Sequence, residues 1–400
     1  MCAWLAELLG LRTIPRRVGV TDRAAVLALW GRFVDELGSG LPLVLLPTLQ
    51  GRLGLSVTQT GWCLQALYGA AAVVEPVAAA ALDLVARRPL LVWGALGWGV
   101  ALLMVAGAPT FGWLAAAFLL MGAASGPLAQ TTDVLLVEMH PGAEERIGAR
   151  QTMLDTTGAL LAPAAVALTG WASADPRLPL VVSGCAILGY AGLLAATPMP
   201  GPGRTAESLS PLHQVRANAV EVLGDREARI WLVALLGETL MDIPALFEPV
   251  WLAGDVGASQ SMVAVHAFVQ MATALVGLAL LDRWLPRYGP RRILTAACVA
   301  NLLAYPAWLL VPGVAAKLVL VVPVTLAVTP VWPLVRARAL MAVAGRGGTV
   351  MAITSLYGVL PLPALFGWSG GRVGLTPTMI AVHTTATLVI LAAVRRARVG

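Results

Sequence analysis

The sequence predicts an all-α membrane protein of twelve transmembrane helices in two pseudo-symmetric six-helix bundles. Its composition is the first reason: 58% of the 400 residues are hydrophobic and only 12% are charged. A soluble domain carries about 25% charged residues, so this chain has too little polar surface to fold in water. The other two reasons are the spacing of its basic residues and a repeat between its two halves.

Twelve apolar segments are long enough to cross a bilayer, which takes roughly 20 residues of helix. They cover residues 24–49, 58–82, 89–108, 111–138, 150–172, 178–198, 228–252, 259–281, 292–312, 315–335, 349–368 and 375–394. The segments predict an N-terminal bundle over 24–198 and a C-terminal bundle over 228–400. Residues 1–23 are expected to be a cytoplasmic N-terminal segment, and residues 199–227 a cytoplasmic linker with an interfacial helix.

The basic residues predict the orientation of these helices. If the loops are numbered alternately from the N-terminus, all but four of the 27 basic residues fall on one side. The four exceptions are Arg52, Arg177, Lys317 and Arg372. Cytoplasmic loops carry an excess of Lys and Arg, so both termini are expected in the cytoplasm. The predicted location is the inner or plasma membrane of the cell, with multiple passes.

The two halves also repeat. A shift of about 200 residues superposes small and polar residues of one half on the other, which is typical of a unit used twice. This register pairs Asp35 with Glu238, Ser39 with Asp242, Gly158 with Gly358, and Pro163 with Pro363.

Two motifs resemble those of the major facilitator superfamily of secondary transporters. The loop from Gly277 through Asp282 and Arg283 to Arg292 is similar to the superfamily's G-x-x-x-D-R-x-G-R-R loop, with stretched spacing. The matching loop in the first half keeps Asp83, Arg87 and Arg88. The segment from Gly158 to Ala167, which includes Pro163, resembles the G-x-x-x-G-P-x-x-G-G signature of facilitator antiporters, although Val166 departs from it.

This resemblance implies roles for residues near the helix ends. Acids and arginines there would form cytoplasmic latches that close the inner side. The expected gate or latch residues are Asp83, Arg87, Arg88, Asp155, Asp282, Arg283 and Arg336. Small residues let helices approach and rock, and proline bends a helix. The expected hinge residues are Gly158, Pro163, Gly358 and Pro363.

Acidic residues within the apolar segments are the main functional signal, because a carboxylate in hydrocarbon is costly and rare without a task or a partner. The expected proton-coupling or substrate-cavity residues are Asp35, Glu36, Ser39, Gln130, Asp133, Glu238 and Asp242. Asp35 and Ser39 are four residues apart and share a helix face, as do Glu238 and Asp242. By the repeat, Asp35 and Glu238 should face each other near mid-membrane, where such transporters bind their cargo. The alternative is a structural role for Asp35, in which its carboxylate is hydrogen-bonded only to serine or to backbone groups at the helix break from Gly38 to Pro42.

These residues predict a proton-coupled transporter, an efflux antiporter for a small amphipathic or cationic compound. The expected partners are that small molecule, protons and the lipid bilayer, with no nucleic acid, and we expect a monomer. We expect no cofactor, no metal site and no enzymatic activity, because the sequence lacks a phosphate loop, a nucleophile elbow and a CxxC pair. Alternatives left open are a proton symporter, a divalent-metal exporter, a lysolipid flippase or scramblase, and a non-transporting membrane sensor.

Overall fold

The computed structural model describes residues 20–81, 86–140, 144–199, 219–342 and 347–397. Within these ranges the regular structure is helical, with no strand, which confirms the predicted all-α class. The chain divides into two compact units. One holds the described residues of Met1–Leu45 and Ala66–Ser208, and the other holds those of Leu46–Gln65 and Leu209–Gly400.

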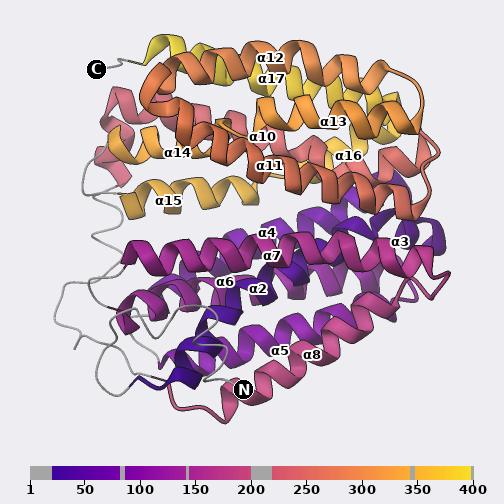
Figure 1. The fold of residues 1–400 in the computed structure, drawn as a ribbon, viewed down its shortest axis with the longest axis vertical. Coiled ribbons are helices and arrows are strands. Elements are labelled where there is room, and N and C mark those ends of the chain that lie inside the picture. Colours follow the sequence, from indigo (N-terminus) through magenta and orange to yellow (C-terminus); the bar gives the residue numbers. More distant parts are fainter. Residues whose placement is uncertain (1–19, 82–85, 141–143, 200–218, 343–346, 398–400) are drawn as a thin grey trace. The chain divides into compact units, whose positions relative to one another are not determined.

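The first unit is built from long helices, which Figure 1 shows in indigo to magenta. They are α2 (Asp22–Val44), the second part of α4 (Val57–Ala81), α5 (Arg87–Ala106), α6 (Phe111–Met139), α7 (Glu144–Trp171) and α8 (Leu178–Ala195). Within this unit α2 packs against α6 and α7, and α5 packs against α6 and α8. The charged residues of α2 therefore meet side chains from α6 and α7.

The predicted segment 24–49 forms two helices rather than one. Thr21 caps the start of α2, because its hydroxyl accepts the backbone N–H of Ala24 at 3.2 Å. The helix ends at Val44, and α3 (Leu46–Leu53) follows. Pro47 has no backbone N–H for the carbonyl of Leu43, which favours a break at this point.

The second unit holds α3, the first part of α4 and the helices drawn from rose to yellow in Figure 1. Those helices are α10 (Arg226–Gly254), α11 (Gln260–Tyr288), α12 (Pro290–Leu310), α13 (Val314–Val328), α14 (Val331–Ala342), α15 (Gly347–Ser355), α16 (Leu362–Val373) and α17 (Leu375–Arg396), with the 3₁₀ turn η2 (Leu356–Val359) before α16. Its core includes Trp231, Leu235 and Met241 of α10 and Ile390 of α17.

Nine helical stretches in the described ranges are long and apolar enough to cross a membrane. The stretch 314–342 counts as one of them and joins α13 to α14. Helix α2 is not among the nine, since every 18-residue window in it contains Arg32, Asp35 and Glu36. The predicted segment 349–368 is divided among α15, η2 and α16. Each predicted segment is thus largely helical where it is described, and the total of twelve crossings stays a prediction.

Candidate functional site

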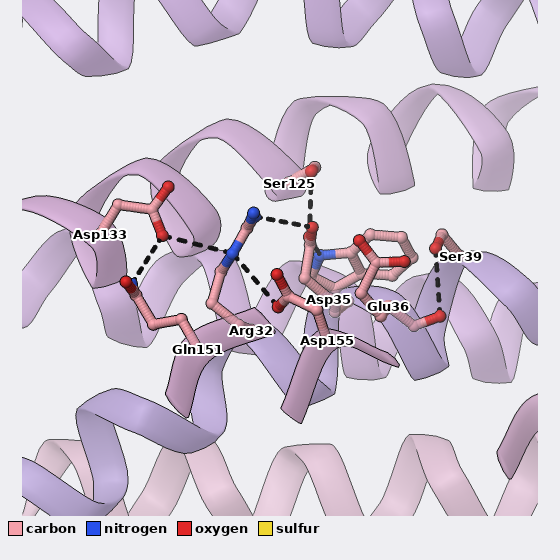
Figure 2. Close-up of polar contacts among 9 residues, drawn as sticks. Arg32, Asp35, Glu36, Ser39, Ser125, Asp133, Gln151 and Asp155 are labelled. Carbon is pink, nitrogen blue, oxygen red and sulfur yellow. Dashed lines mark hydrogen bonds and ion pairs between the residues drawn. The ribbon is translucent and has the colours of Figure 1, made fainter. Parts of the chain in front are cut away.

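Arg32 of α2 is the centre of a charged cluster in the first unit (Figure 2). Its Nε lies 3.2 Å from Oδ1 of Asp133 and 3.3 Å from Oδ1 of Asp155. Its Nη1 lies 3.9 Å from Oδ2 of Asp35, one turn along the same helix. One guanidinium therefore serves three carboxylates from three helices. The three acids were predicted from the sequence, whereas Arg32 was counted only among the 27 basic residues that predict the orientation of the helices.

Glycine positions the three helices of this cluster. Gly31 of α2 lies against Thr132 of α6. Because the two helices are this close, the residues that follow, Arg32 on α2 and Asp133 on α6, come within ion-pair distance. Gly158 lies against the backbone of α2, where an added Cβ would sit 2.6 Å from the carbonyl oxygen of Phe33. Asp155 is one turn before Gly158. The close helix contacts that small residues permit therefore place all three acids around Arg32.

Asp35 is the most enclosed of these acids, with 8% of its surface exposed. Its Oδ1 accepts hydrogen bonds from Nε1 of Trp98 and from Oγ of Ser125, both at 2.9 Å. Gly38 leaves room for the Trp98 ring, since an added Cβ would lie 2.7 Å from it. Trp98 and Ser125 were not predicted as site residues, because neither residue is acidic. The only local signal in the sequence for this contact was a small residue, Gly38, one helical turn after Asp35.

Asp133 lies at the more exposed end of the cluster. Its side chain is 50% exposed, whereas that of Asp155 is 23% exposed. Gln151 of α7 donates from Nε2 to Oδ1 of Asp133 at 3.0 Å. Arg32 thus connects a buried carboxylate to one that is half exposed.

The other predicted cavity residues of this unit lie nearby with different partners. Glu36 is half-buried and packs close to Gly158. Its Cβ lies 3.1 Å from the point that a Cβ would occupy if one were added to Gly158. The hydroxyl of Ser39 donates to the backbone carbonyl of Glu36 at 3.1 Å, so its hydrogen bond stays within the helix. Gln130 is half-buried on α6. The described donors to Asp35 are therefore a tryptophan and a serine from other helices.

In the second unit, Glu238 and Asp242 of α10 lie within hydrogen-bonding reach of each other. Glu238 is 4% exposed, whereas Asp242 is exposed. Among the residues that the structure describes, neither has an arginine or lysine within ion-pair distance. Two carboxylates can share a hydrogen bond only if one of them holds a proton.

A third acid of α10, Glu248, lies in a buried polar cluster that sequence analysis did not single out. It is 4% exposed, and its Oε2 accepts a hydrogen bond from Nε2 of Gln270 at 3.1 Å. The ring of Tyr305, on α12, stacks on that of His383, with centroids 3.7 Å apart. The spacing of His266 and Gln270 on one helix face was the available signal.

The predicted latch residues show few contacts with one another where they are described. Asp83 lies outside the described residues. Arg87 is buried in the first turn of α5, and Arg88 is exposed. Asp282 and Arg283 are exposed near the end of α11. No ion pair joins Asp282 or Arg283 to a described residue. The latches therefore stay predictions.

Two predicted gate residues have other described partners. Asp155 pairs with Arg32, as above. The guanidinium of Arg336 lies over the ring of Trp332, 5.3 Å from its centroid. This contact holds the arginine on its own helix, α14, by a cation–π interaction.

The predicted hinge pairs differ in structure. Gly158 and Pro163 lie inside the continuous helix α7. Gly358 lies in the 3₁₀ turn η2, and Pro363 lies in the first turn of α16. The carbonyl of Gly358 accepts a hydrogen bond from Nε2 of Gln65 at 3.2 Å. The second pair therefore marks a true break in its segment, whereas the first does not.

Comparisons with known proteins agree with this architecture. A sequence model described as the Major Facilitator Superfamily matches residues 28–364. The fold is similar to a bacterial homologue of the human lysosomal transporter Spinster, with a TM-score of 0.75, 15% identity, and coverage of 93% of this chain and 96% of that one. The nucleoside transporter NupG gives a TM-score of 0.76 at 13% identity, with 94% and 100% covered. A POT family transporter bound to 5-aminolevulinic acid gives 0.72 at 12% identity, with 96% and 98% covered. No curated protein matches the sequence.

Proposed function

Since the chain belongs to the Major Facilitator Superfamily, a family of multi-pass membrane transporters, we propose that it is a proton-coupled secondary active transporter. In this proposal it works as an efflux antiporter that exports a small amphipathic or cationic organic compound by alternating access. The observation that carries the proposal is the enclosed carboxylate of Asp35, held by Trp98 and Ser125 and linked through Arg32 to Asp133.

The charge balance of the first unit supports a positively charged cargo. Arg32 supplies one positive charge to Asp35, Asp133 and Asp155, and Glu36 lies beside them. Charged groups at this depth are costly unless they are paired. A proton or an organic cation that joins the cluster brings its charge closer to zero. An anionic cargo would add to the excess of negative charge.

The contacts of Asp35 suggest how binding of a proton replaces binding of cargo. When Asp35 is ionised, Trp98 and Ser125 both donate to Oδ1, and Oδ2 has the Nη1 of Arg32 at 3.9 Å, a long contact for which a cationic cargo can compete. When Oδ2 takes a proton, the attraction for cargo is lost, while Arg32 keeps Asp133 and Asp155 as partners. Cargo and proton then bind in turn, which is the requirement for exchange.

The carboxyl pair of the second unit has a complementary role in this proposal. Glu238 and Asp242 hold one proton between them and release it when cargo approaches. The pairing of Asp35 with Glu238 across the two halves, predicted from the repeat, remains part of the proposal. So does closure of the inner side by cytoplasmic arginines. We further propose a monomer in the inner or plasma membrane with both termini in the cytoplasm.

The test is transport by purified protein in proteoliposomes with an imposed pH gradient. Ethidium and tetraphenylphosphonium are the cationic probes, and uridine is the uncharged comparison. With an acidic lumen, we expect the cations to accumulate as protons leave. Asp35→Asn should abolish this accumulation, because an amide cannot take up and release the proton. Asp175→Asn is the matched control, since Asp175 is an exposed acid whose described ion partner is Arg177 at 3.8 Å.

The alternatives give different results in the same vesicles. A symporter would accumulate its probe in the direction of proton movement. A divalent-metal exporter would accumulate manganese or zinc rather than ethidium. A scramblase would move a labelled lysolipid without a gradient, and an uncoupler would not stop it. Wild-type cation exchange by Asp35→Asn would overturn the proposal.

A further inference from the structure

A groove of about 570 Å³ lies in the second unit, between the start of α10 and the end of α17. Three arginines line it: Arg226 and Arg229 of α10, and Arg396 of α17. The rest of the lining is apolar, with Ile230, Val233 and Val389 among it. Both helix ends belong to the side that the basic residues predict to be cytoplasmic. The groove therefore joins three positive charges to an apolar wall at the expected membrane surface.

The three arginines have no carboxylate partner among the residues that the structure describes. The two acids that flank Arg226 in the sequence are engaged at the start of α10. Asp225 caps α10 by accepting the backbone N–H of Ala228 at 2.7 Å, and Glu227 accepts a hydrogen bond from Nε1 of Trp231 at 3.2 Å. The positive charge of the groove is thus left for a ligand, and the start of α10 adds the partial positive charge of a helix N-terminus.

The groove lies on the side of α10 turned away from the acid pair. Asp242 is nine residues after Val233, which on a regular helix places the two about 180° apart. Val233 is 50% exposed although it lies in a membrane-crossing helix. The groove therefore lies on the face of α10 opposite Asp242, where an apolar side chain is exposed.

We propose that this groove binds an anionic phospholipid of the cytoplasmic leaflet. The phosphate and headgroup lie among Arg226, Arg229 and Arg396, and an acyl chain follows Val233 and Val389 into the membrane. Arginine pairs with phosphate through two parallel hydrogen bonds, and basic pockets between transmembrane helices suit anionic headgroups. The site goes beyond the proposed transport and does not depend on proton coupling.

The test is lipid binding to the purified full chain in detergent, followed by native mass spectrometry and thermal unfolding. The probes are phosphatidylglycerol, phosphatidylcholine and inorganic phosphate. We expect saturable binding and a higher melting temperature with phosphatidylglycerol only. Each arginine near the surface contributes about 1 kcal/mol to attraction of anionic lipid, so Arg226→Gln with Arg229→Gln and Arg396→Gln should weaken binding by about 100-fold.

The matched control replaces three other basic residues of the same unit, Arg287, Arg291 and Arg292, with glutamine. These arginines do not line the groove, and we expect less than a threefold change. Ala392→Trp is the second variant, because Ala392 lines the groove and is exposed, so a larger side chain fills the groove and spares the arginines. It should weaken binding at least tenfold. Equal losses in both triple variants, equal binding of phosphatidylcholine, or an equal effect of free phosphate would overturn the proposal.

Discussion

The two units hold their intramembrane acids in different ways. In the first unit, Asp35, Asp133 and Asp155 share the guanidinium of Arg32. In the second unit, Glu238 and Asp242 lie beside each other without a basic partner among the described residues. The repeat in the sequence pairs Asp35 with Glu238, yet the surroundings of these two acids are not alike.

This difference shows two ways of keeping a carboxyl group in an apolar environment. An ion pair lets the acid stay charged, provided that its partner remains. A shared proton removes the charge and leaves a hydrogen bond. Neutralising substitutions should therefore disturb the first unit more than the second. The free energy of unfolding in detergent, compared between variants of the two units, measures this contrast.

Removal of the shared cation should have the largest effect. Arg32→Met leaves three carboxylates without their partner, and we expect a loss of about 3 kcal/mol, the lower end of the range for a buried pair because Asp133 is half exposed. Thermal and denaturant unfolding measure the change. Arg177→Met is the control, since the pair of Arg177 with Asp175 is exposed and should contribute less than about 1 kcal/mol. An equally mild effect of both variants would show that Arg32 does not hold the cluster.

The helix contact that forms the cluster should be nearly as sensitive. Gly158→Ala places a methyl group 2.6 Å from the Phe33 carbonyl, a backbone atom that cannot turn aside. We expect a loss of about 2 kcal/mol from overpacking. Gly189→Ala in α8 is the control, because a methyl group there meets no atom within 4 Å, and alanine favours a helix. A stable Gly158→Ala protein would mean that α7 can move away from α2 at little cost.

The donors to Asp35 should show a smaller effect. Trp98→Phe keeps most of the ring against Gly38 and removes the N–H that donates to Asp35. A hydrogen bond to a charged group contributes about 1.5 kcal/mol or more, so we expect a loss of that size. Trp113→Phe is the control, since its N–H donates to the carbonyl of Met104 at an exposed position. If the two variants unfold alike, Asp35 does not depend on Trp98.

The acid pair of the second unit should show the smallest change. Glu238→Gln leaves an amide that can donate a hydrogen bond to Asp242, so the free energy of unfolding should change by less than about 0.5 kcal/mol. Proton-driven exchange should nevertheless fall, because the pair can no longer release its proton. A loss as large as that of Trp98→Phe would indicate that Glu238 is held as an ion. The contrast between the units would then disappear.

Much of the fold was predictable from sequence, because hydrophobic length and basic-residue spacing are local properties. The predicted helices 89–108 and 178–198 correspond closely to α5 and α8. The breaks after Val44 and at η2 were less predictable, although each lies next to proline. The acids of the candidate site were also predictable, because a charge in an apolar segment stands out. Their partners were not, since Trp98 and Ser125 are ordinary residues of membrane helices.

The sequence by itself determined the all-α membrane class of the protein and placed Asp35, Asp133, Asp155, Glu238 and Asp242 within its long apolar segments. Only the tertiary structure decided which of them meet a cation, because that depends on where glycines such as Gly31 and Gly158 let helices touch. It also buried Lys317, a predicted loop charge, whose Nζ donates to the carbonyl of Leu309 at 2.8 Å. A charge in the sequence carries no record of its partner, since the partner comes from a distant helix brought near by packing.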